Sequence, residues 1–99
     1  VKEAAKVRFP LDRFIGNWWS GAHVDVEPLG MKAKGYKSSN FTPAGRDFPV
    51  VQDVIKYVVS KGMTKTEPQM PGKVLYNRSL FMAVIIHEAI LEAQKLAGK

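Results

Sequence analysis

The chain contains no cysteine among its 99 residues, which excludes disulfide bonds and thiolate metal sites. It lacks an uninterrupted run of about 20 apolar residues, so we predict no membrane-spanning segment. Residues 1–6 are charged helix formers and do not resemble a secretory signal peptide. The sequence also lacks a Gly-rich phosphate loop, a nucleophile elbow and a pair of carboxylates at a spacing that would indicate catalysis. We therefore predict that the protein is not an enzyme.

Acidic residues are in the minority, 9 against 15 basic ones, so the formal net charge is +6. A basic protein raises the question of nucleic acid or an anionic membrane as a partner. The excess is spread along the chain, and its densest group is Lys32, Lys34 and Lys37. No Arg-rich arm and no nucleic-acid-binding module is recognisable. We predict no nucleic-acid partner.

The first half of the chain predicts short elements of both kinds. Residues 1–8 are helix formers that end at Phe9-Pro10. Residues 13–18 predict a buried strand because Phe14 and Ile15 favour β structure. A short helix or turn is expected over residues 22–29, and a weak second strand over residues 35–41.

A clear helix follows the turn-rich residues 42–45. Asp47 is the expected N-cap, Pro49 lies in the first turn and Gly62 ends the helix. Apolar side chains recur with the spacing of one buried helical stripe. They are Val51, Val54, Ile55, Val58 and Val59.

The last segment, residues 73–99, predicts a long helix. Asn77 or Ser79 is the expected cap, and Gly98 the expected end. Residues 80–86 are apolar on every side, so this part of the helix should be deeply buried. From His87 onward the helix becomes amphipathic.

These elements in order predict an α/β fold in which a short crossover joins two parallel strands. Two strands are too few for an independent sheet, and the apolar helix needs more partners than the chain supplies. We therefore expect an internal fragment of a larger α/β protein.

The best functional candidates are Trp18 and Trp19, beside Ser20, where the first strand should end. Ligands of open α/β sheets bind at the carboxyl ends of strands. Adjacent strand residues face opposite sides, so one indole should enter the core and the other meet a cleft. The alternative is that both indoles only pack.

Tyr76 and Asn77 are the second candidates, because they precede an apolar helix whose N-terminus favours anions. Structural capping is the alternative. His23, Asp25 and Glu27 alternate and would share a face on a strand, as metal ligands could. Their segment is loop-like and without a second ligand cluster, so we favour a solvated polar turn and predict no metal or other cofactor.

The chain resembles a known family. Residues 14–21, Leu29-Gly30 and residues 33–36 resemble the second lobe of type I periplasmic binding proteins, the substrate-binding components of branched-chain amino-acid ABC transporters. Residues 48–62, 74–80 and 88–94 are similar to the two helices that follow in that family. The resemblance covers nearly the whole chain in one register.

The resemblance implies a fragment of a two-lobed fold: residues 1–42 as a strand–helix–strand piece of the second lobe, and residues 43–99 as two helices of the first. It implies a periplasmic solute-binding component of an ABC importer, with a permease as partner. The ligand it implies is a small organic acid, an amino acid or an aromatic compound, bound between the lobes. The ligand-binding residues implied are Trp18, Trp19, Ser20, Tyr76 and Asn77.

The stretch around Trp18 has no carboxylate before Asp25 to hold an ammonium group, which favours a carboxylic acid or an amide as ligand. The alternative function is a ligand-sensing domain of a receptor or transcriptional regulator with the same fold. A small stand-alone interaction protein is a third possibility. Self-association or a complementary fragment would cover the apolar helix.

Overall fold

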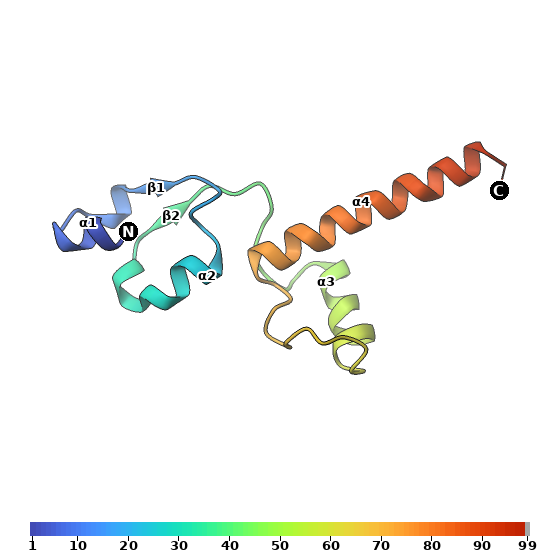
Figure 1. The fold of residues 1–99 in the computed structure, drawn as a ribbon, viewed down its shortest axis with the longest axis horizontal. Helices are drawn as coiled ribbons and strands as arrows, with labels where there is room; N and C mark the ends of the chain where they lie inside the picture. Colours follow the sequence, from blue (N-terminus) through green and yellow to red (C-terminus); the bar gives the residue numbers. More distant parts are fainter. Residues whose placement is uncertain (99) are drawn as a thin grey trace. The chain divides into compact units, whose positions relative to one another are not determined.

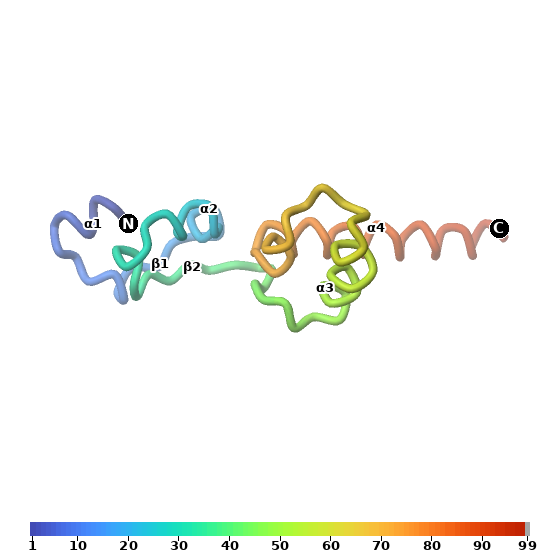
Figure 2. The backbone as a smooth tube through the Cα atoms, turned by 90° about the horizontal axis from the view of Figure 1, so that it is seen from below, coloured from blue at the N-terminus to red at the C-terminus, as the bar shows by residue number. Residues whose placement is uncertain are grey.

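The computed structural model describes residues 1–98 and divides into two compact units, Val1–Pro43 and Ala44–Lys99 (Figures 1 and 2). The boundary predicted from the sequence lies between residues 42 and 43. Each unit has its own buried residues, among them Ala22 and Thr42 in the first and Val51, Val74 and Asn77 in the second.

The first unit is built from short helical turns around one pair of strands. Its elements are α1 (Lys2–Lys6), the 3-10 helix η1 (Leu11–Arg13), β1 (Ile15–Gly16), α2 (His23–Val26), the 3-10 helix η2 (Glu27–Ala33) and β2 (Lys37–Ser38). The strands are parallel, with Ile15 opposite Lys37 and Gly16 opposite Ser38. The chain between them passes through α2 and η2 (Figure 1).

The predicted α/β class is wrong, because the described residues are mostly helical and each strand has only two residues. Turns shorten the first strand at both ends. Before it, the Phe14 N–H donates to the Leu11 carbonyl at 3.1 Å, which closes η1. After it, the Ser20 N–H donates to the Asn17 carbonyl at 3.1 Å. These two turns take up most of the residues expected to form a strand.

The second unit begins with α3 (Pro49–Val54), which continues as the π-helix η3 (Ile55–Val59). The predicted helix is therefore present, but Phe48 occupies the N-cap position in place of Asp47. The five predicted stripe residues are all buried or half-buried, as Val50 also is, and of the five only Val51 is fully buried. Gly62 follows in a left-handed conformation at φ 65°, which suits a glycine after a helix.

The long helix α4 runs over Val74–Leu96. Lys73 occupies its N-cap position, so neither Asn77 nor Ser79 caps it. Near its start, Phe81 packs edge-to-face on Phe48, with ring centroids 5.7 Å apart.

Residues 80–86 are not deeply buried in the part of the chain that the structure describes, so that prediction is wrong. Ile85 is 62% exposed, and the later part of α4 extends past α3 (Figures 1 and 2). By length and composition alone, α4 is one helix that could cross a membrane, and 11% of its most apolar stretch is buried. The prediction from the sequence missed this helix because it required an uninterrupted apolar run. Charged residues are tolerated near the ends of a spanning helix, since their side chains can reach the interface.

Candidate functional site

The two tryptophans lie in a tight turn after β1 and not in the strand itself. The indole rings stack with centroids 4.1 Å apart and an interplanar angle of 28°. Trp18 also meets Phe41 edge-to-face at 5.3 Å. The expectation that the two indoles face opposite sides is therefore wrong, because strand alternation ends before the turn. Trp19 is 71% exposed and Trp18 37%.

Asn17 and Tyr36 hold this turn in place. The side-chain oxygen of Asn17 accepts the Trp19 N–H at 3.1 Å. The Tyr36 hydroxyl, next to β2, donates toward the Ser20 carbonyl oxygen at 3.0 Å and lies 2.9 Å from Ser20 Oγ. The Ser38 hydroxyl donates to the Asn17 carbonyl at 2.9 Å. The hydroxyl of Ser20, a predicted ligand group, is thus engaged within the turn.

A cavity of about 820 Å³ lies beside this turn, in the size range of small-molecule sites. Its lining combines apolar and polar groups, which include Phe14, Trp19, Leu29, Tyr36, Asp25 and Lys2, with Ser20 beside them. Two of the predicted residues, Trp19 and Ser20, are therefore on its wall. Such a cavity can accept an apolar or aromatic body and a polar end.

Sequence reasoning missed Asp25 and Tyr36 as wall residues. Asp25 lies on α2 and brings a carboxylate to the same cavity as Trp19. The sequence argument looked for an acid within the tryptophan stretch, whereas the fold supplies one from the next helix. Lys2 also lines this cavity, so its wall carries one acidic and one basic side chain.

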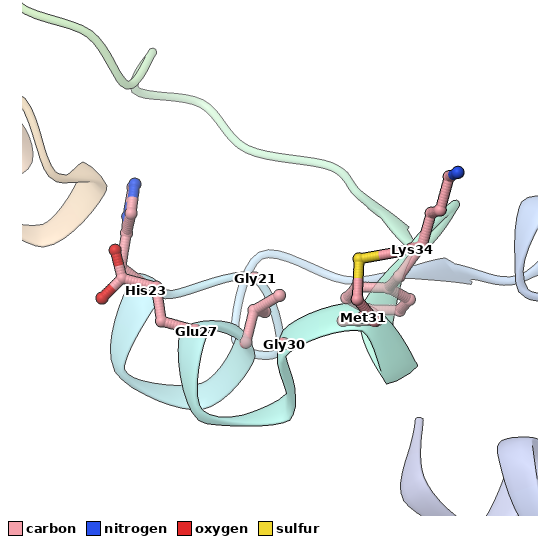
Figure 3. Close-up of a pocket in the computed structure, with 9 residues that line it drawn as sticks. Gly21, His23, Glu27, Gly30, Met31 and Lys34 are labelled. Atoms are coloured by element: carbon pink, nitrogen blue, oxygen red, sulfur yellow. The ribbon is translucent and has the colours of Figure 1, made fainter.

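His23 and Glu27 do not share a face with Asp25, because the segment is helical and not a strand. They line a second cavity of about 480 Å³ (Figure 3). Their side chains lie at one end of it, and Met31 and Lys34 at the other (Figure 3). Among residues 1–98, no three His, Asp or Glu side chains are grouped so as to hold a metal ion.

Tyr76 and Asn77 belong to the second unit, whereas Trp18, Trp19 and Ser20 belong to the first. Tyr76 is half-buried in the first turn of α4. Asn77 is fully buried, and its side-chain amide forms hydrogen bonds with two backbone groups. That these five residues contribute to one ligand site stays a prediction.

No family model and no curated protein matches this chain. One solved structure is similar, described as the crystal structure of an ABC transporter permease from the Pseudomonas fluorescens group. It is 38% identical, with a TM-score of 0.85, and the match covers 99% of this chain and 24% of that chain. The chain thus spans about a quarter of the length of that protein.

This neighbour overturns the predicted family. It is described as a permease and not as a periplasmic binding protein, so the predicted solute-binding function is wrong. The alternative of a ligand-sensing domain has no support either. The chain resembles a permease itself and not the binder of one, while the wider context of ABC transport is supported.

The predicted periplasmic location is wrong for the same reason. The neighbour is described as a permease, and α4 is one helix long and apolar enough to cross a membrane, by length and composition only.

Proposed function

We propose that this chain is part of the membrane component of an ABC transporter and takes part in solute transport without being an enzyme. The observation that carries the proposal is its 38% identity, over nearly its whole length, to a structure described as an ABC transporter permease. The apolar helix α4 supplies independent support.

The dimensions of α4 suit a bilayer. Its 23 residues correspond to about 35 Å of helix, compared with about 30 Å for the hydrocarbon core. Over residues 74–91 the charged side chains are Arg78 and Glu88, one near each end. Between them most of the exposed side chains are apolar, including Met82, Ile85 and Ile86, and the exposed polar ones are Ser79 and His87. Lipid or another apolar helix would cover them.

The test is membrane integration of the full-length protein. We expect it to stay in the membrane through an alkaline carbonate wash and to be released only by detergent. Ile85→Arg, in the middle of the apolar stretch, should cost about 2.5–3.5 kcal/mol of insertion free energy and shift the protein to the soluble fraction. Gln94→Arg, near the end of α4, is the matched control and should change little. Release of the wild-type protein by carbonate alone would refute the proposal.

Within this proposal, the cavity beside Trp19 contacts the transported small molecule. Its apolar and aromatic wall would hold the body of the solute, the Asp25 carboxylate a cationic group and the Lys2 ammonium an anionic group. Binding of leucine, phenylalanine and benzoate is measured by the quenching of tryptophan fluorescence. Asp25→Asn should weaken the two amino acids and spare benzoate, while Asp53→Asn in α3 is the charge-matched control. Equal weakening of all three would contradict the role of Asp25.

Self-association through α4 belongs to the same proposal. Exposed Ile86 and Ile90 would be buried against a second copy as readily as against lipid. Sedimentation of the full-length protein in detergent, with and without Ile90→Asn, measures it. A monomer in both samples would exclude this contact.

A further inference from the structure

A separate cavity of the first unit lies where α1 packs against η2. Its volume is about 700 Å³, which is within the range of small-molecule sites. It shares Lys2 and Leu29 with the cavity beside Trp19 but is otherwise made of different residues. The lining consists of Lys2, Ala5, Lys6, Pro28, Leu29 and Lys32.

The charges of this lining all have one sign. Lys2 and Lys32 make no ion pair with any of residues 1–98. Lys6 pairs at 2.7 Å with Glu3, its neighbour on α1, but both side chains are well exposed, and such a pair is weak. No carboxylate lines the cavity. Three ammonium groups around one hollow attract an anion.

The rest of the lining is apolar. Ala5 comes from α1, and Pro28 and Leu29 come from η2, where the proline fixes the backbone angle φ. Ala5 and Leu29 are half-buried, so they form the inner wall, whereas the three lysines are exposed. A free inorganic ion would leave this inner wall uncovered. An anion with an apolar part would use both kinds of surface.

We infer that this cavity binds an amphipathic oxyanion, a phosphate or carboxylate head joined to an apolar body, with Lys2 and Lys32 holding the head. This inference rests on the proposed function in one respect: in a membrane protein the available source of such a group is an anionic lipid. A soluble organic phosphate offers the same chemistry, and the experiment separates the two.

The experiment measures binding of the full-length protein to vesicles of phosphatidylcholine with and without phosphatidylglycerol. We expect the double variant Lys2→Gln/Lys32→Gln to lose roughly 10- to 30-fold in affinity for the phosphatidylglycerol vesicles, since each lysine near an anionic surface contributes to attraction. Its binding to pure phosphatidylcholine should be unchanged. The control Lys34→Gln/Lys37→Gln removes the same charge from the same unit. Its affinity for the phosphatidylglycerol vesicles should fall by less than about twofold.

Each other outcome overturns part of the inference. Equal losses in the two double variants would mean that the general field of the basic surface attracts the lipid, not the cavity. Lysine-dependent binding of monomeric dihexanoyl phosphatidylglycerol or inorganic phosphate, without an effect on vesicles, would assign the site to a soluble anion. Wild-type binding to neutral vesicles tests the proposed membrane function separately, because it depends on α4 and not on these lysines.

Discussion

The side-chain amide of Asn77 donates a 2.9 Å hydrogen bond to the carbonyl oxygen of Gly45, 32 residues earlier in the chain. The same amide accepts the Gly72 N–H at 3.1 Å. Gly45 and Gly72 are themselves joined, N–H to carbonyl, at 2.8 Å. One buried side chain thus ties the start of the second unit to the loop that leads into α4.

Replacing Asn77 should destabilise the second unit. Asn77→Ala removes both hydrogen bonds and leaves buried backbone groups unpaired, which should cost about 2–4 kcal/mol in the free energy of unfolding. Urea denaturation followed by circular dichroism measures it. Ser79→Ala, on the exposed side of the same helix turn, should change stability by less than about 0.5 kcal/mol. If Asn77 acted only on a ligand, Asn77→Ala would leave the denaturation midpoint unchanged.

Gly72 should tolerate alanine worse than Gly62, although both have positive φ angles, 100° and 65°. A Cβ at Gly72 would lie 2.6 Å from Arg46 Cγ and 3.3 Å from the Gly45 carbonyl carbon, whereas a Cβ at Gly62 meets open space. Gly62→Ala should therefore cost about 1 kcal/mol for the strained backbone alone. Gly72→Ala should cost about 1–3 kcal/mol more. Equal shifts of the two melting temperatures would contradict this crowding.

The stacked indoles should give a spectroscopic signature. Trp18→Phe and Trp19→Phe should each abolish the exciton signal of the indole pair in circular dichroism, because that signal needs both rings. Their stabilities should differ, however. Trp18→Ala loses contacts with both Trp19 and Phe41 and should destabilise the first unit by about 1–3 kcal/mol. Trp19→Ala changes a mostly exposed side chain and should destabilise the first unit by less than about 1 kcal/mol. Persistence of the signal in either Phe variant would show that the rings do not couple.

Local patterns predicted the helices well. The spacing from Val51 to Val59 located α3 and η3 and their inward face, because helical periodicity is written into neighbouring residues. The strands were predicted at about the right places but too long. Turn hydrogen bonds at Leu11 and Asn17 compete with the sheet, and residue preferences alone do not show which of them wins.

The candidate site was only partly visible in the sequence. Trp19 and Ser20 were predicted to bind a ligand; they line a cavity, and the ligand-binding role stays a prediction. Asp25 and Tyr36 were not expected there, because they reach it from α2 and from the chain next to β2. Asn77 was singled out for a ligand, and its hydrogen bonds join backbone groups that are distant in the chain.

By itself the sequence determined where helices form and which of their faces are apolar, because these properties depend on residues three or four positions apart. It also determined the basic charge and the absence of thiol chemistry. The tertiary structure decided that the two indoles stack, that Asp25 joins Trp19, that three lysines surround one hollow and that Asn77 is buried. Those relationships depend on how turns and backbone hydrogen bonds bring together distant parts of the chain within each unit.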